Sequence, residues 1–248
     1  MKAMIFAAGL GTRLKPLTDT LPKALVPVCG QPLLYHVIKR LRDAGADEIV
    51  VNVHHFADKI ENYLAENDFG IKISVSDERN LLLETGGAIR HAAPLLASES
   101  GDGYFLVHNV DIVSDMDLGA LMHSVRNDAL AVLPVSERET RRYFLFDDDM
   151  RLVGWTDTGT GEIRSPYRDI DADACRKYAF TGIHLISEKI FSAFGRYGFG
   201  ERFPIVDFYL RACADYPVYG RVQKDLTLVD VGKAETLSEA ERVCSRIL

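Results

Sequence analysis

Four residues near the amino terminus, Gly9, Gly11, Thr12 and Arg13, combine a flexible backbone with a hydroxyl and a cation in one loop. Without a Cβ, each glycine lets the main chain approach a phosphate closely and donate N–H groups to it. The threonine hydroxyl and the planar guanidinium also suit phosphate oxygens. Because Ala8 ends an apolar run just before this loop, the spacing predicts a strand followed by a loop that binds a nucleoside triphosphate.

Two widespread phosphate-binding motifs do not fit this loop. The P-loop and the dinucleotide fingerprint Gly-x-Gly-x-x-Gly both require a glycine at the position of Leu14. An ordinary turn would explain a lone Gly-x-Gly equally well. The additional Thr12-Arg13 and Pro22-Lys23 pairs favour a phosphate site over such a turn.

The segment from Ala7 to Lys23 resembles the signature Gly-x-Gly-Thr-Arg-x-x-Pro-x-Thr, followed by Pro-Lys, of the sugar-1-phosphate nucleotidylyltransferases. Every position of that signature is filled, by Gly9, Gly11, Thr12, Arg13, Pro16, Thr18, Pro22 and Lys23. The resemblance implies transfer of a nucleotidyl group from a nucleoside triphosphate to a sugar 1-phosphate, with release of pyrophosphate. It also implies that Arg13 neutralises the departing pyrophosphate and that Lys23 holds the reacting phosphates. Such transfers depend on positioning and charge neutralisation, and they need no covalent nucleophile.

The resemblance further implies a magnesium ion, which prefers oxygen ligands and is commonly held by one or two carboxylates. Asp111 ends an apolar strand pattern, and Asp230 lies in the run Thr227–Gly232, which resembles the family's late Asp-x-Gly segment. Val110 stands where the family usually has glycine, and Leu228 where an aromatic residue is common. A purely structural role is the alternative for each aspartate. We expect Asp111 and Asp230 to be the metal ligands.

Two further segments resemble substrate-binding parts of the family. Glu84, Gly86 and Gly87 lie at the expected start of a helix, where the equivalent stretch contacts the nucleobase. Thr181 and Gly182 resemble the Thr/Ser-Gly strand of the sugar pocket. An ordinary helix cap is the alternative for the first segment. The Glu-Lys-Pro triplet that larger members carry before the sugar-pocket strand is absent, so the sequence says least about that pocket.

Three other polar residues lie at expected strand ends. Asn109 is expected to contact the sugar substrate, and Asn52 faces the substrate by the same argument. His108 either meets the nucleotide or packs as a strand-end histidine, and packing is favoured. Recognition of the base is expected to rest on backbone positions around Glu84–Gly87 and Glu78.

Patterns of two periods alternate along the chain, which is typical of an α/β fold. Strand patterns cover 3–8, 48–53 and 71–75, and helical patterns cover 32–44, 57–66 and 233–247. Asp115 and Asp117 are expected to cap a helix that begins near Leu118. We therefore predict a single nucleotidyltransferase domain over residues 1–248, with a Rossmann-like, mostly parallel sheet flanked by helices. The resemblance implies the nucleotide-diphospho-sugar transferase type of this fold.

The segment 138–177 has a different character from the rest of the chain. An acidic run at Asp147–Asp149 lies between apolar pairs, and a glycine-rich run follows at Asp157–Gly161. Because aspartate favours turns, these runs predict a hairpin and a mobile flap rather than a cation site.

Composition restricts the partners and the compartment. A net charge of −7 over 248 residues argues against nucleic acid or an anionic membrane as the main partner. The chain has no leader pattern and no apolar run of membrane-spanning length, so we expect a cytoplasmic protein, monomeric or a small homo-oligomer. Its four cysteines, Cys29, Cys175, Cys213 and Cys244, form no Cys-x-x-Cys pair. This scatter predicts reduced thiols, with neither a zinc site nor a disulfide framework.

The leading functional prediction is uridylyl transfer to the 1-phosphate of an N-acetylated amino sugar. The Glu-Thr-Gly-Gly run at residues 84–87 resembles N-acetylmuramate-1-phosphate uridylyltransferases and some mannose-1-phosphate guanylyltransferases, so guanylyl transfer to mannose 1-phosphate is the alternative. The departures at Val110 and Leu228 leave a third hypothesis, a nucleotide-sugar-binding module without turnover. Magnesium dependence and pyrophosphate release discriminate the enzyme from the binding module.

Overall fold

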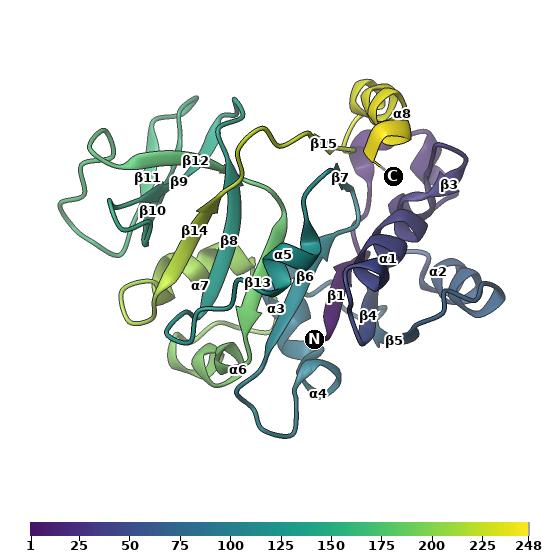
Figure 1. Ribbon diagram of the computed structural model, residues 1–248, viewed down its shortest axis with the longest axis horizontal. Helices are drawn as coiled ribbons and strands as arrows, with labels where there is room; N and C mark the ends of the chain where they lie inside the picture. The colour runs from purple at the N-terminus through teal and green to yellow at the C-terminus, as the bar shows by residue number, and fades with distance from the viewer. Residues whose placement is uncertain (248) are drawn as a thin grey trace.

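The computed structural model describes residues 1–247, and one large sheet runs along the length of the molecule (Figure 1). Its strands follow the spatial order β11-β10-β9-β12-β8-β13-β6-β1-β4-β5, and β14 also pairs with β8. In chain order they are β1 (Ala3–Phe6), β4 (Glu48–Val53), β5 (Lys72–Asp77), β6 (Tyr104–Asn109), β8 (Ala131–Ser136), β9 (Arg142–Phe146), β10 (Leu152–Asp157), β11 (Glu162–Arg164), β12 (Arg176–Phe180), β13 (Ile183–Ser187) and β14 (Val218–Val222). Two small sheets accompany it, formed by β2 (Pro27–Val28) with β3 (Gln31–Pro32) and by β7 (Ile112–Ser114) with β15 (Leu228–Asp230).

The strands β6, β1, β4 and β5 are parallel to one another and form the half of the sheet that contains the amino-terminal strand. In the register of this half, Phe6 at the end of β1 lies opposite both Asn52 and Asn109. Three strands therefore end at the same level of one sheet edge, which is where open α/β sheets bind ligands.

The other half of the sheet is built from antiparallel strands. Strand β13 pairs antiparallel with β6 and joins the halves, and β8, β9, β10, β11 and β12 continue outward as antiparallel neighbours, with β14 parallel to β8. The predicted Rossmann-like α/β class is confirmed. The segment expected as one strand through Thr181-Gly182 is interrupted there, because Gly182 takes a φ of +79° and separates β12 from β13.

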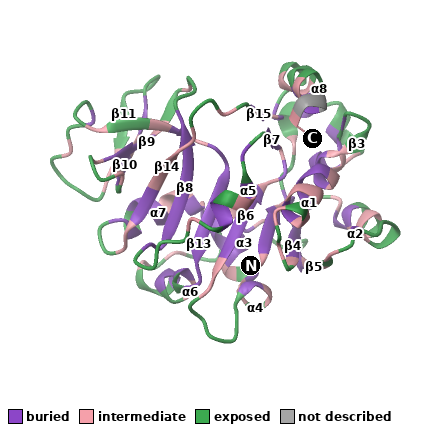
Figure 2. Ribbon diagram, viewed as in Figure 1, coloured by how far each residue is buried: buried purple, intermediate pink, exposed green. Residues whose placement is uncertain are grey.

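Helices cover both faces of the sheet, because alternate residues of its strands point into two different cores. On β1, Ala3 and Ile5 belong to one core and Met4 to the other. The first core packs against α1 (Leu33–Asp43), α2 (Ala57–Glu66), α5 (Leu118–Met122) and α8 (Ala234–Ile247), and the second against α3 (Glu84–His91), α4 (Ala93–Leu96), α6 (Lys189–Ala193) and α7 (Ile205–Ala212). Short 3₁₀ turns complete the fold: η1 (Thr12–Leu14), η2 (Leu17–Asp19), η3 (Lys23–Leu25) and η4 (Phe194–Arg196). The central strands are buried and the connecting loops exposed (Figure 2).

Most of the expected local elements are confirmed, and one expected cap is wrong. The Asp117 side chain accepts a hydrogen bond from Ala120 N at 2.7 Å and caps α5 as predicted. Asp115 instead accepts from Thr227 N at 3.0 Å, and so fastens the chain that enters β15 to β7. The acidic run forms the turn of the β9–β10 hairpin, as expected. No helix among residues 1–247 is long and apolar enough to cross a membrane.

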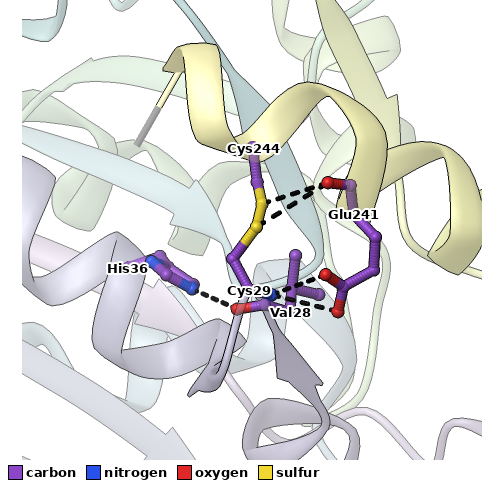
Figure 3. Close-up of a disulfide and its surroundings, with 5 residues drawn as sticks. All are labelled: Val28, Cys29, His36, Glu241 and Cys244. Carbon is purple, nitrogen blue, oxygen red and sulfur yellow. Dashed lines mark hydrogen bonds between the residues drawn. A yellow bond between two sulfur atoms is a disulfide. The ribbon is translucent and has the colours of Figure 1, made fainter.

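The cysteines differ from the expectation of four reduced thiols. Cys29, in the turn between β2 and β3, is joined by a disulfide to Cys244 of α8, with a Cα–Cα distance of 6.5 Å (Figure 3). Cys175 and Cys213 are free. The pairing partners lie 215 positions apart in sequence, and spacing alone cannot reveal such a contact, which depends on the packing of the last helix against the first hairpin.

Candidate active site

A pocket of about 510 Å³ opens at the shared carboxyl edge of β1, β4 and β6. Its lining comes from the loop after β1, the ends of the three strands, the approach to α3 and the segment before α8. The lining residues are Phe6, Ala8, Gly9, Leu10, Gly11, Thr12, Arg13, Lys23, Asn52, Glu78, Leu82, Glu84, Thr85, Asn109, Val110, Asp111 and Gly232. The structure thus brings the expected phosphate loop, both expected cations and Asp111 into one cavity.

The loop after β1 needs glycine at one of its two expected positions. Gly11 has a φ of +64°, and a Cβ there would lie 2.8 Å from Thr18 Cγ2 and 3.1 Å from Lys23 Cβ. The Thr18 hydroxyl donates to the Gly11 carbonyl at 2.8 Å, which holds the loop against η2. Gly9 has no positive φ, and a Cβ there would meet nothing within 4 Å. Close packing therefore requires glycine at position 11, whereas Gly9 contributes an open backbone facing the pocket.

A buried polar pair sets the direction of the backbone at the start of this loop. Asn52 Oδ1 accepts hydrogen bonds from Ala7 N at 2.7 Å and Ala8 N at 3.3 Å, and its Nδ2 donates to Glu78 Oε1 at 2.8 Å. Burial raises the pKa of the Glu78 carboxyl, although the Asn52 bond opposes that shift. Asn52 and Glu78 therefore line the pocket, and Asn52, held by Glu78, also fixes the backbone at the start of the loop.

A cluster of opposite charges lies beside the loop. Lys23, which is largely buried, forms an ion pair with Asp111. Asp230 lies close to this pair, and burial, with a smaller contribution from the Asp111 charge, raises the pKa of its carboxyl. Its Oδ1 atom is buried and has no hydrogen-bond partner within residues 1–247. Val231 N donates to the Asp111 carbonyl at 2.8 Å, so the backbone itself holds the two aspartate segments together.

Two residues of this cluster were not singled out from the sequence. A Cβ at Gly232 would lie 2.8 Å from the Arg13 guanidinium and 3.0 Å from Asp230 Oδ1, so glycine lets the cation and the carboxylate come close. The Asp-x-Gly spacing carried that signal. The pKa of Asp230 is raised by burial, and the positive charge of Arg138 is a small contribution that opposes this rise. The Arg138 guanidinium donates to the Phe180 carbonyl at 3.0 Å. No pattern in the sequence marked Arg138.

The two departures from the family pattern are accommodated by packing. Val110 lines the pocket but is largely buried against the first core, and its N–H donates to the Phe6 carbonyl at 3.2 Å. Leu228 packs against the same core and pairs with Ser114 across β15 and β7. Neither side chain removes a charged group from the cluster.

The segment at the start of α3 divides into two parts. Glu84 and Thr85 line the pocket, and Arg202 holds the Glu84 carboxylate at 2.7 Å. Gly86 N and Gly87 N both donate to the Phe203 carbonyl, at 2.9 and 3.2 Å, so these N–H groups are already bonded. A Cβ at Gly86 would lie within 2.4 Å of the Phe203 ring. Because the two glycines lack a Cβ, the segment before α7 can pack closely against the start of α3. The glycines do not line the pocket.

The expected sugar-pocket residues lie behind the pocket wall. Thr181 is fully buried, and its hydroxyl donates to the Pro134 carbonyl at 2.8 Å. The Gly182 carbonyl accepts from Asn109 N at 3.0 Å, and a Cβ at Gly182 would lie 2.9 Å from Asn109 Nδ2. Asn109 itself lines the pocket. Thr181 and Gly182 form the corner between β12 and β13, and this corner supports the Asn109 side chain that faces the pocket.

His108 packs inside the sheet, as favoured from the sequence. It is fully buried, and burial, together with the charge of Arg40, lowers the pKa of His108 to about 3. Its Nδ1 lies 2.7 Å from the Asn109 carbonyl. The imidazole is therefore neutral at physiological pH and does not line the pocket.

Comparison with known proteins shows the family of the chain. The family model described as nucleotidyl transferase matches residues 2–148. An N-acetylmuramate alpha-1-phosphate uridylyltransferase of Caulobacter vibrioides is 36% identical over 244 residues, which are 96% of this chain and 95% of that protein. The chain belongs to the sugar-1-phosphate nucleotidylyltransferase family. The matched model covers β1, the phosphate loop, Lys23 and Asp111 of this nucleotidylyltransferase.

Two other relatives support the family and the fold of this nucleotidylyltransferase. A second N-acetylmuramate alpha-1-phosphate uridylyltransferase, from Neisseria meningitidis, is 45% identical over 121 residues, 48% of this chain and 51% of that protein. A UDP-glucose pyrophosphorylase solved with UDP-glucose superposes with a TM-score of 0.77, covering 99% of this chain and 98% of that one at 16% identity. The first similarity supports the family, and the second shows the fold.

Proposed function

We propose that this nucleotidylyltransferase transfers a uridylyl group from UTP to the 1-phosphate of an N-acetylated amino sugar. Nucleotidyl transfer to a sugar 1-phosphate is the reaction of its family. The main support for this base and sugar class is one relative, an N-acetylmuramate alpha-1-phosphate uridylyltransferase. The similarity extends over 95% of that protein. The second relative with the same name, at 45% identity over half the chain, supports the same choice.

In this proposal Arg13 and Lys23 each neutralise a different part of the negative charge on the reacting phosphates. Arg13, exposed at the loop tip, neutralises the departing pyrophosphate, and Lys23 holds the α-phosphate and the attacking sugar phosphate as charge builds between them. A sugar-phosphate oxygen attacks the α-phosphorus, the bond to the pyrophosphate oxygen breaks, and no protein nucleophile takes part. The ion pair between Lys23 and Asp111 supports these roles, because it holds the ammonium group in the pocket before substrate binds.

Asp111 and Asp230 are the proposed magnesium ligands. The residues fit a hard cation: both are carboxylates, and the buried Asp230 Oδ1 has no hydrogen-bond partner within the described chain. When bound, magnesium supplies positive charge to the phosphate oxygens. The chain's own part is to hold two carboxylates together through the Val231 N–H bond to the Asp111 carbonyl.

The remaining expected residues take binding roles in the same proposal. Ala8, Gly9, Gly11 and Thr12 bind the triphosphate through the loop backbone and a hydroxyl, and Glu84 lies against the nucleoside. Asn109 contacts the sugar phosphate. The supporting residues Gly86, Gly87, Thr181 and Gly182 act through the residues that they position.

The test is pyrophosphate release with magnesium across a grid of UTP, GTP, CTP, ATP and dTTP against the 1-phosphates of N-acetylmuramic acid, N-acetylglucosamine, glucose and mannose. The proposal expects the highest kcat/KM for UTP with an N-acetylated amino sugar 1-phosphate. A preference for GTP with mannose 1-phosphate would overturn the proposed base and sugar. An Asp111→Asn variant, folded by circular dichroism, is the control for contaminating activity.

A further inference from the structure

The disulfide joins two chain segments that each lead away from the charged cluster of the pocket. Cys29 lies in the β2–β3 turn, which follows directly on η3 and Lys23. Cys244 lies in α8, which follows directly on Asp230 and Gly232. Their Cα atoms are 6.5 Å apart, within the usual range for a disulfide. One covalent bond therefore connects the segment that carries Lys23 to the segment that carries Asp230.

Contacts other than the disulfide hold Cys29 and Cys244 near each other. Cys244 is fully buried in the core beneath α8, whereas Cys29 is exposed at the hairpin turn. Both carboxylate oxygens of Glu241 accept a hydrogen bond from Cys29 N at 3.0 Å, so α8 holds the turn through its own side chain (Figure 3). The helix also contacts β2, β7 and β15. The turn and the helix are thus positioned by bonds other than the disulfide.

We propose that Cys29 and Cys244 form a redox-controlled clamp that fastens α8 to the β2–β3 hairpin and rigidifies the Asp230 side of the pocket. The oxidant is a small-molecule disulfide. The exposed Cys29 thiolate attacks one sulfur of that disulfide and releases one thiolate, leaving a mixed disulfide on Cys29. Cys244, as a thiolate, then attacks the Cys29 sulfur and releases the second thiolate. Two protein thiols lose two protons and two electrons in all, and the small-molecule disulfide becomes two thiols.

The other two cysteines are unsuited to this exchange. Cys213 is buried, and that burial raises the pKa of its thiol to about 12. Burial also raises the pKa of Cys175, and the Asp171 charge adds to the shift. Neither residue is joined to another cysteine, whereas the Cα atoms of Cys29 and Cys244 lie at a disulfide distance. The pair at 29 and 244 is therefore the redox-sensitive pair of the chain.

The clamp goes beyond the proposed function, and its test needs no nucleotide. The full chain is equilibrated with oxidised or reduced glutathione, and its cysteines are mapped by alkylation and peptide mass spectrometry. Oxidation is expected to protect Cys29 and Cys244 together, with Cys175 and Cys213 still alkylated after denaturation. Amide hydrogen exchange in α8 is then expected to slow by about tenfold in the oxidised form, because the clamp removes local openings of the helix.

Matched variants separate the clamp from a packing effect. Cys29→Ser changes an exposed residue and should abolish the redox response of α8, whereas Cys175→Ser should leave it intact. Four alkylated cysteines after oxidation, or α8 exchange that does not respond to redox state, would overturn the proposal. So would tight zinc retention by the reduced chain that is lost in Glu241→Gln, since it would assign Cys29, Glu241 and Cys244 to a metal site. These measurements need no substrate, so they test the clamp even if no nucleotide and sugar 1-phosphate pair releases pyrophosphate.

Discussion

The loop after β1 and the corner between β12 and β13 both carry glycine-containing motifs, yet they contribute to the pocket in different ways. The loop puts its own atoms into the cavity, from Ala8 through Arg13. The corner puts none there: Thr181 bonds to Pro134, and Gly182 packs against Asn109. The loop follows a parallel strand at the ligand-binding edge, whereas the corner joins β12 and β13, which both pair antiparallel with β8.

Glycine-containing motifs therefore serve two different physical roles in this molecule. In the loop, a charged side chain and backbone atoms line the pocket itself, and the proposed function has them act directly on the ligand. At the corner, a positive φ and a close backbone approach position another residue. The start of α3 shows the same division within four residues, because Glu84 faces the pocket while Gly86 and Gly87 admit the segment at Phe203. Substitutions should therefore affect chemistry in the loop and geometry at the corner.

The strongest test of a direct role is Lys23→Ala. Loss of this ammonium group should lower kcat by about a thousandfold, because it removes a preorganised positive charge from the developing phosphate charge. Lys23→Arg keeps the charge and should recover part of the rate. Pyrophosphate release measures the effect, and a thermal melt confirms that the variant folds. Turnover within a few-fold of the parent would show that Lys23 only pairs with Asp111.

An indirect role at the corner is tested by Gly182→Ala. The added Cβ would lie 2.9 Å from Asn109 Nδ2 and displace that side chain, so kcat/KM should fall by roughly tenfold to a hundredfold. The matched control is Gly161→Ala, which has a similar φ of +74° and no atom within 4 Å of the added Cβ. Both should lose about 1 kcal/mol of stability from backbone strain, and Gly182→Ala should lose more because of the added contact with Asn109. Equal activity in the two variants would remove the proposed support of Asn109.

The strands that join the two halves each bury a histidine, and this predicts acid sensitivity of the whole fold. Burial lowers the pKa of His108 on β6 and of His184 on β13 to about 3. The unfolded chain gains a proton on each near pH 6.5, so between about pH 6.5 and 3 it binds more protons than the folded chain, and stability falls as pH falls. Urea unfolding should show a loss of about 2 kcal/mol for the pair between pH 7 and pH 5.5.

The variant His184→Gln provides the control for this titration. It removes one of the two buried imidazoles, so the loss of stability over the same pH interval should shrink by about half. A pH dependence identical to that of the parent would assign the acid sensitivity to other groups.

The sequence predicts the direct contributors better than the supporting ones. Arg13, Lys23 and Asp111 follow strands of a recognisable parallel unit, and the carboxyl ends of such strands meet at one edge, so their convergence in the pocket follows from the pattern. The clash that a Cβ at Gly86 would make with Phe203 depends on the packing of α7 against α3, which no local pattern encodes. The disulfide partner of Cys29 was hidden for the same reason, since it comes from the last helix. Long-range packing, rather than local propensity, is what the sequence left open.

The smallest expected effect is that of Thr181→Val, which tests whether Thr181 supports the corner or binds the sugar. Thr181→Val keeps the branched shape and removes the hydroxyl that donates to the Pro134 carbonyl at 2.8 Å. Because that carbonyl also accepts from Thr181 N at 3.3 Å, it is not left unpaired, and the cost should be about 1 kcal/mol in urea unfolding. The KM for the sugar 1-phosphate should change by less than twofold. A large rise in KM without loss of stability would place the Thr181 hydroxyl on the sugar, and the corner would then join the loop as a direct part of the site.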